Sequence, residues 1–112
     1  LQARTLLGYS PAQRVGLLRI DGRDPGQVRA GAERLATQLR IDLRRRDAGA
    51  PSVDVLGPAE APLSRLKGRS RWQILLRSPS SQALRALLRV GLSVRLGSSL
   101  RITADVDPSS TL

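Results

Sequence analysis

The feature of this sequence that most restricts its fold is the order in which two hydrophobic periods follow each other. Apolar residues recur at every second position, as in a half-buried strand, or at every third and fourth position, as in an amphipathic helix. The two-residue period occupies 14–21, 52–56, 72–77 and 100–106, and the helical period occupies 25–45 and about 80–90. The predicted order is therefore strand, helix, strand, strand, helix, strand.

Local signals agree with this order. Asp24 followed by Pro25 is typical of a helix start, and Ser78 or Ser80 is a candidate cap for the second helix. Between the second and third strands we expect a long, proline-marked connection over 57–70. The order is that of the split βαβ pattern. We therefore predict an α+β, ferredoxin-like βαββαβ sandwich, with a four-stranded antiparallel sheet and two helices on one of its faces.

The length of 112 residues suits one compact domain. We predict that 9–112 form this domain and that 1–8 are a short helical lead-in or a linker from an upstream domain. No apolar run approaches the roughly 20 residues of a membrane span, so no membrane partner is expected. A chain without cysteine suits a reducing compartment, and we expect the protein to be cytoplasmic.

The composition excludes most catalytic classes. The absence of Cys and His removes zinc fingers, iron–sulfur clusters, thiol nucleophiles and histidine-based triads. There is no Walker-type phosphate loop. Asp105 and Asp107 form the nearest carboxylate pair, but Asp107 precedes Pro108 and is better explained as a strand terminator. We predict no catalytic residue, no metal site and no cofactor, and therefore a binding domain.

Charge gives the strongest indication of a partner. The formal net charge is +10, with ten Arg against seven acids in residues 1–60 and nine basic residues against two acids in 61–112. No acid occurs between Ala61 and Ala104. We expect this acid-free stretch to present uncountered guanidinium groups to a polyanion, with nucleic acid favoured over an acidic protein surface.

The sharpest local signal is a run of alternate cations that ends just before the third strand. In an extended segment such cations point the same way and suit phosphate contacts, whereas the plainer interpretation is a solvated loop. The predicted nucleic-acid-binding residues are Arg65, Lys67, Arg69, Arg71, Arg77 and Arg101. Trp72 is the one residue there that is able to stack on a base, and it is equally well explained as a core residue.

The same segment carries a family resemblance. The spacing Gly-Pro-x-x-x-Pro from Gly57 to Pro62, followed by Gly-Arg-x-Arg-Trp-Gln from Gly68 to Gln73, resembles the C-terminal domain of the PriA family, the primosomal protein N′ of bacterial replication restart. Further matches occur in order along the whole chain: Gly8-Tyr9-Ser10-Pro11, Gly22-Arg23-Asp24 and Asp105-Val106-Asp107-Pro108.

The resemblance implies a piece of a larger protein, an ATP-dependent 3′–5′ DNA helicase whose motifs are absent from this segment. In the family this domain contacts DNA near the fork junction and helps to form a pocket for the acidic tail of single-stranded DNA-binding protein, SSB. The family's pocket arginine falls on Ser81, and a neighbouring pocket residue falls on Arg85, which would take over the carboxylate contact. We predict Ser81, Arg85 and Arg89 as the SSB-tail site.

The predicted function is that of a non-catalytic C-terminal domain of a PriA-like protein. It would bind forked or single-stranded DNA through a basic surface, and its further partners would be SSB and the upstream helicase lobes of the same chain. The alternative is a free-standing RNA-binding or ribosomal-type interaction module of the same fold. No group of residues in the sequence supports the hypothesis of a small enzyme.

Overall fold

The computed structural model describes residues 14–46, 52–61 and 68–106 of the chain. The elements follow in the order β2 (Arg14–Gly22), α1 (Pro25–Arg44), β3 (Asp54–Glu60), β4 (Ser70–Ser78), α2 (Ser81–Ser93) and β5 (Arg101–Val106). The strands form one antiparallel sheet in the order β3-β4-β2-β5. The predicted ferredoxin-like α+β architecture is confirmed.

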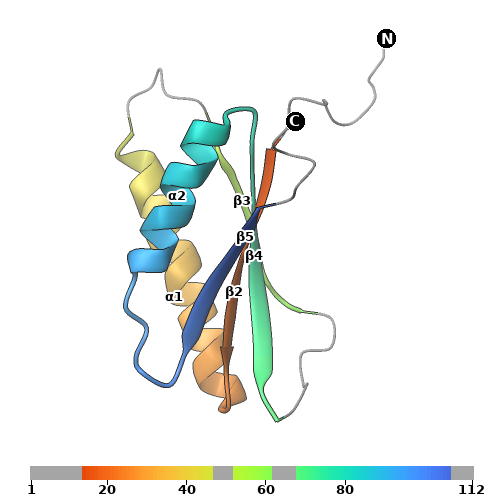
Figure 1. Ribbon diagram of the computed structural model, residues 1–112. Coiled ribbons are helices and arrows are strands. Elements are labelled where there is room, and N and C mark those ends of the chain that lie inside the picture. The colour runs from red at the N-terminus through yellow and green to blue at the C-terminus, as the bar shows by residue number, and fades with distance from the viewer. Residues whose placement is uncertain (1–13, 47–51, 62–67, 107–112) are drawn as a thin grey trace.

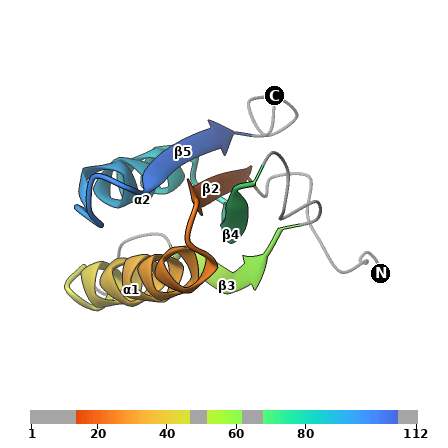
Figure 2. The ribbon, with the colours of Figure 1, turned by 90° about the horizontal axis from the view of Figure 1, so that it is seen from below.

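Both helices lie on the same face of the sheet (Figure 1). Helix α1 packs over β3, β4 and β2, and α2 packs over β2, β4 and β5. Viewed from below, the helices lie side by side along one face of the sheet, with α2 near β5 and α1 near β3 (Figure 2). No described element covers the other face, which is called the open face below.

The core fills the space between the sheet and the helices. The helix-facing side of β2 and β4 contributes Leu18, Ile20, Ile74 and Leu76, all fully buried. The helices contribute the fully or almost fully buried residues Val28, Ala32, Leu35, Ala36, Leu39, Leu84, Leu87 and Leu88. The two periods of the sequence thus produce two complementary apolar surfaces, because each period puts its apolar residues on one side of its element.

Both helix starts use the caps that the sequence indicates. The carboxylate of Asp24 accepts hydrogen bonds from the backbone N–H groups of Gly26 and Gln27, at 2.9 and 3.3 Å. The Ser80 hydroxyl accepts from the N–H of Ala83 at 3.1 Å. Each cap satisfies donors that have no partner within the helix.

The prediction that the second strand ends at Leu56 is wrong, since β3 runs on to Glu60 and includes Gly57 and Pro58. The register against β4 shifts between Leu56 and Ala59. Proline is tolerated here because β3 is an edge strand, and the backbone positions on its outer side need no N–H donor for a neighbouring strand. The Arg40 guanidinium of α1 also donates to the carbonyl groups of Val55 and Gly57, at 3.2 and 2.8 Å, and holds this irregular edge against the helix.

The second helix also extends further than predicted, to Ser93 rather than about residue 90. Gly91, which follows the predicted helix, lies buried inside its last turn. A β-carbon at Gly91 would lie 2.7 Å from Cδ1 of Leu18. The glycine therefore serves the close approach of α2 to β2, and it is not a helix stop.

Candidate functional site

The open face of the sheet combines an apolar centre with charged margins. Cross-strand pairing places Leu17 beside Leu75, and Leu75 beside Leu56, which is 42% exposed. The residues that share this face outside the apolar centre are mostly charged. They include Arg19, Asp21, Asp54, Arg71, Arg77, Arg101 and Asp105. Such a face suits a partner that offers both apolar surface and charge.

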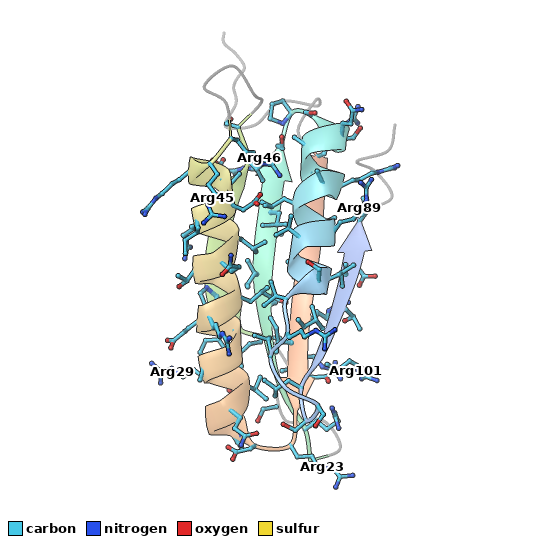
Figure 3. All side chains as sticks on the ribbon, turned by 90° about the vertical axis from the view of Figure 1, so that its left-hand side faces the viewer. Arg23, Arg29, Arg45, Arg46, Arg89 and Arg101 are labelled. Carbon is cyan, nitrogen blue, oxygen red and sulfur yellow. The ribbon has the colours of Figure 1, made fainter. Side chains whose placement is uncertain are left out.

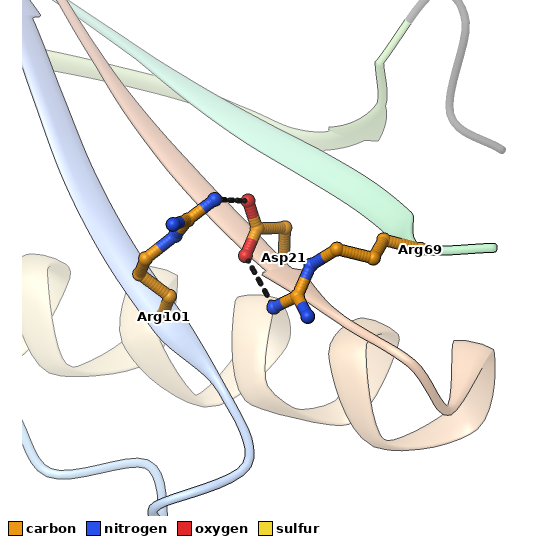
Figure 4. Close-up of polar contacts among 3 residues, drawn as sticks. All are labelled: Asp21, Arg69 and Arg101. Atoms are coloured by element: carbon orange, nitrogen blue, oxygen red, sulfur yellow. Dashed lines mark hydrogen bonds and ion pairs between the residues drawn. The ribbon is translucent and has the colours of Figure 1, made fainter. Parts of the chain in front are cut away.

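One carboxylate organises the end of this face. Asp21 lies at the end of the inner strand β2 and accepts from Arg69 at 3.0 Å and from Arg101 at 2.9 Å, one arginine on each oxygen. Figure 4 shows the carboxylate between the two guanidinium groups. The Asp21 side chain is only 7% exposed, whereas that of Arg101 is 64% exposed. We call Asp21, Arg69 and Arg101 the Asp21 cluster.

The Asp21 cluster shifts the acid–base properties of its members. Burial alone would raise the pKa of Asp21, but the hydrogen bonds and charges of Arg101 and Arg69 outweigh burial and hold the pKa below its usual 3.8. The Asp21 carboxylate in turn raises the pKa of Arg101. Asp21 therefore carries its charge at neutral pH and positions both arginines.

Two further ion pairs lie on the open face. Arg77 of β4 binds Asp54 of β3 through Nε and Nη2, at 3.3 and 3.0 Å. Arg19 of β2 pairs with Asp105 of β5. Both pairs join neighbouring strands, so they fix the side chains of an exposed surface.

These contacts correct the expectation of one uncountered basic patch. Three of the predicted cations, Arg69, Arg77 and Arg101, pair with carboxylates that come from the first half of the chain. Within the described part of the chain, Arg71, opposite Asp21 on β4, forms no ion pair. Charge counts along a sequence miss this neutralisation, because the acids are distant in sequence and adjacent only in the sheet.

The structure divides the predicted site residues between two surfaces. Arg69, Arg71, Arg77 and Arg101 belong to the open face and its end, while Arg65 and Lys67 lie outside the described residues. The three predicted SSB-tail residues lie on the opposite layer. Ser81, Arg85 and Arg89 recur every four residues on α2, and all three are exposed.

The exposed side of α2 that carries Ser81, Arg85 and Arg89, called the outer side of α2 below, has positive charge that is unpaired within the described residues, whereas the open face of the sheet carries ion pairs. Helix α2 contains no acid, and neither Arg85 nor Arg89 has an ion pair with a carboxylate of the described residues. Leu92, 48% exposed, follows on the same helix. Figure 3 shows Arg89 toward one end of the helical layer, with Arg23 and Arg101 toward the other.

Trp72 is not available for stacking on the open face. It lies on the helix-facing side of β4, half-buried against the core. The Arg29 guanidinium of α1 sits over its ring, 5.9 Å from the centroid. This is the geometry of a cation–π contact between helix and sheet, and it favours the core interpretation of Trp72.

Asp21 and Arg19, which belong to the charged part of the open face, were not among the site residues predicted from the sequence. The alternation of residues 14–21 put Arg19 on the side away from Leu18 and Ile20, and Asp21 follows it by two. What the chain does not reveal is that Arg101 lies directly opposite Asp21 on β5. That pairing depends on the register of two strands eighty residues apart.

Neither a metal centre nor a membrane segment is found in the described ranges. They contain no group of three or more Asp or Glu side chains close enough to hold a metal ion. Neither α1 nor α2 is long and apolar enough to span a bilayer.

Comparison with known proteins places this geometry in context. The family model described as the primosomal protein N C-terminal domain matches residues 5–109. The chain is 34% identical over 110 residues to the probable replication restart protein PriA of Deinococcus radiodurans, covering 98% of the chain and 11% of that protein. The replication restart protein PriA of Synechocystis sp. is 31% identical over 111 residues, covering 98% of the chain and 12% of that protein.

A third relative, the replication restart protein PriA of Haemophilus influenzae, is 41% identical over 58 residues, covering 50% of the chain and 8% of that protein. The chain thus spans about a tenth of the length of these curated relatives. Among solved structures, a designed protein with a ferredoxin fold is similar at a TM-score of 0.58 and 10% identity, over 84% of the chain and 83% of the design. That similarity concerns the fold alone.

Proposed function

Since the chain belongs to the family of primosomal protein N C-terminal domains, we propose that it is the non-catalytic, DNA-binding C-terminal domain of a replication restart protein. Its surface for forked or single-stranded DNA would be the open face of the sheet. Membership of this family supports a DNA-related role. It also favours this hypothesis over a free-standing RNA-binding module, because the matched relatives are replication proteins.

The observation that carries the proposal is the concentration of arginines at one end of the open face. Arg71 and Arg101 flank Asp21 on the two strands beside β2, and Arg69 approaches from the start of β4. Three arginines thus surround one carboxylate, which pairs with only two of them and leaves a positive excess. Arginine suits this role because its planar fork of donors binds phosphate with defined geometry.

The ion pairs on this face reduce its field without removing its donors. Arg101 uses one Nη2 bond to Asp21 and remains mostly exposed. An arginine has five N–H donors, so a single carboxylate contact leaves several for phosphate oxygens. A surface of this kind would position a DNA backbone more than it would attract DNA over a long range.

The experiment that tests the proposal is DNA binding at several salt concentrations. We expect the chain to bind forked and single-stranded oligonucleotides with an affinity that falls steadily as salt rises, because phosphate contacts release counterions. RNA of the same sequence and structure is the matched comparison. An affinity independent of salt, or a clear preference for RNA, would contradict the proposal.

A second function is favoured by the acid-free outer side of α2. We infer that Ser81, Arg85 and Arg89 bind the acidic tail of SSB, with Leu92 as an exposed apolar neighbour. Titration with an acidic tail peptide tests this separately from DNA. Loss of peptide binding in Arg85→Ala, with DNA binding retained, would assign the two partners to the two layers.

A further inference from the structure

A cavity opens beside the Asp21 cluster, at the end of the domain where β2 turns into α1. Its volume is about 490 Å³. The polar residues that line it and could donate to a ligand are Arg23, Arg69, Arg101, Gln27, Ser98 and Ser99. They come from the β2–α1 turn, α1, the start of β4, β5 and the turn before β5. We call this cavity the three-arginine pocket.

The fold fixes the walls of the pocket. At Gly22 a β-carbon would lie 2.7 Å from Cδ2 of Leu100 and 3.1 Å from the carbonyl oxygen of Ser99. The absence of a side chain therefore lets the turn before β5 approach the end of β2. The Ser99 hydroxyl also donates to Oε1 of Gln27 at 3.2 Å, which ties the turn to α1.

The charges around the pocket do not cancel. Arg23, Arg69 and Arg101 face two nearby carboxylates, both already engaged. Asp24, which also lines the pocket, accepts from the first N–H groups of α1. Asp21 gives one oxygen to Arg69 and the other to Arg101. Arg23 has no ion pair with a carboxylate of the described residues.

Arg69 also remains short of acceptors. Its Nη2 binds Asp21, but its Nε is buried and finds no hydrogen-bond partner in the described part of the chain. Buried donors without partners are rare in folded proteins, so this guanidinium group still lacks acceptors among the described residues. The arginine is thus held in place without being saturated.

We propose that the three-arginine pocket binds a phosphate group of nucleic acid. The choice of phosphate over carboxylate follows from the number of acceptors. A carboxylate has two oxygens, and in Asp21 each of them binds one arginine. A phosphate offers additional oxygens, which suit a third guanidinium from Arg23 and the hydroxyl groups of Ser98 and Ser99.

The proposal rests on DNA binding by the open face and adds a defined subsite to it. A volume of about 490 Å³ exceeds what a bare phosphate needs and falls in the range that accommodates a small ligand. A single nucleotide, attached through its phosphate to the arginines, matches this size. The phosphate has two possible sources, a strand end and the internal backbone, and the experiment must separate them.

The test is an amide NMR titration of the isotope-labelled 112-residue chain at constant ionic strength. The probes are thymidine 5′-monophosphate, thymidine 3′-monophosphate, the thymidine dinucleoside monophosphate with its internal diester, and thymidine. We expect the phosphate-containing probes to shift the amide signals of 22–27 and 98–101, and thymidine to shift none of them. Tighter binding of a monophosphate assigns a strand end, and tighter binding of the diester assigns the backbone.

Arg23→Gln is the variant of choice, because Arg23 is exposed and no described ion pair depends on it. We expect it to weaken the binding of the best probe about five- to tenfold, as for the loss of a charge-assisted hydrogen bond. Arg45→Gln is the matched control, an exposed arginine at the end of α1 that we expect to leave probe binding unchanged. An equal effect of both variants would overturn the pocket in favour of general charge attraction.

The remaining outcomes separate the two proposals. If the probes leave 22–27 and 98–101 unshifted while forked DNA still binds with salt dependence, the pocket is wrong and the open-face function stands. If the probes bind but DNA does not, the pocket binds single nucleotides, and both the DNA-binding function and the assignment of the phosphate to nucleic acid are wrong. A peptide ending in two aspartates that shifts these amides at lower concentration than every nucleotide would overturn the phosphate assignment.

Discussion

The Asp21 cluster and the outer side of α2 are both rich in arginine, yet they differ in how the arginines are held. In the cluster, Arg69 and Arg101 are positioned by a buried carboxylate. On α2, Arg85 and Arg89 project from a helix without acids and have no carboxylate partner in the described ranges. The same residue type therefore carries two different physical roles in one small domain.

The paired arginines of the Asp21 cluster have a fixed orientation, whereas the arginines of α2, unpaired in the described part of the chain, have a stronger electrostatic field. An arginine held by a carboxylate loses much of its long-range field but keeps a fixed orientation and spare donors. An unpaired arginine on a helix attracts anions from a distance, but its flexible side chain must be ordered on binding. We therefore expect the cluster to contribute to stability and specific contact, and α2 to contribute to association.

The largest expected effect is that of Asp21→Asn. The substitution removes the charge, and the NH2 group of asparagine, itself a donor, then faces one of the two guanidinium groups that each bind an oxygen of Asp21. We expect the free energy of unfolding to fall by about 2 kcal/mol, below the usual cost of breaking a buried pair because Arg101 is exposed. Urea denaturation at neutral pH measures it, with Arg85→Gln as the control on α2. Equal stability of the two variants would remove the distinction between the regions.

The contribution of the Asp21 cluster to the free energy of unfolding should depend on pH in the acid range. The pKa of Asp21 lies below its unfolded value of 3.8, so its stabilising effect is complete above that value and disappears as the pH falls through the folded pKa. We expect the stability gap between the wild-type chain and Asp21→Asn to be constant from neutral pH to about pH 5. It should then narrow below pH 3.8. A gap that stayed constant into strong acid would show that Asp21 acts through shape and not charge.

The next effect concerns DNA affinity. Arg71 lies opposite Asp21 on the open face and forms no ion pair in the described part of the sheet. We expect Arg71→Ala to weaken binding of single-stranded or forked DNA by about 1 kcal/mol, roughly fivefold, through loss of one phosphate contact. It should also reduce the dependence of affinity on salt. Arg45→Ala, at the end of α1, is the control, and an equal loss there would indicate non-specific attraction.

The smallest effect is expected on α2. Arg85→Ala should weaken binding of an acidic tail peptide by about 0.5–1 kcal/mol, because an exposed charge pair is screened by solvent. It should leave the free energy of unfolding within about 0.5 kcal/mol of the wild-type value. Isothermal titration and urea denaturation measure the two quantities. Peptide binding that Arg71→Ala impairs more than Arg85→Ala would place the acidic partner on the sheet instead.

Much of the fold was predictable from local patterns. The alternation that separates Leu18 and Ile20 from Leu17 and Arg19 places each residue on the correct side of β2, and Asp24 caps α1 as expected. Errors arose where tertiary contacts override local signals. Gly57 and Pro58 resemble a turn but continue an edge strand, and Gly91 resembles a helix end but serves close packing.

The candidate site was less predictable than the fold. The sequence indicated a basic domain, and alternation put Arg77 and Arg101 on the polar sides of their strands. It gave no indication that Asp21 and Asp54 would pair with cations from the second half. It also could not bring Arg23 to the same cavity as Arg69.

What the sequence alone determined is the set of elements and the side of each that is apolar, because hydrophobic periodicity is a local property of the chain. What only the tertiary structure decided is which charges meet. That depends on the order β3-β4-β2-β5 and on the register between β2 and β5, which place Arg101 opposite Asp21 across eighty residues. Charge interactions depend on distance in space, and distance in space is fixed by strand pairing and not by the count of residues between them.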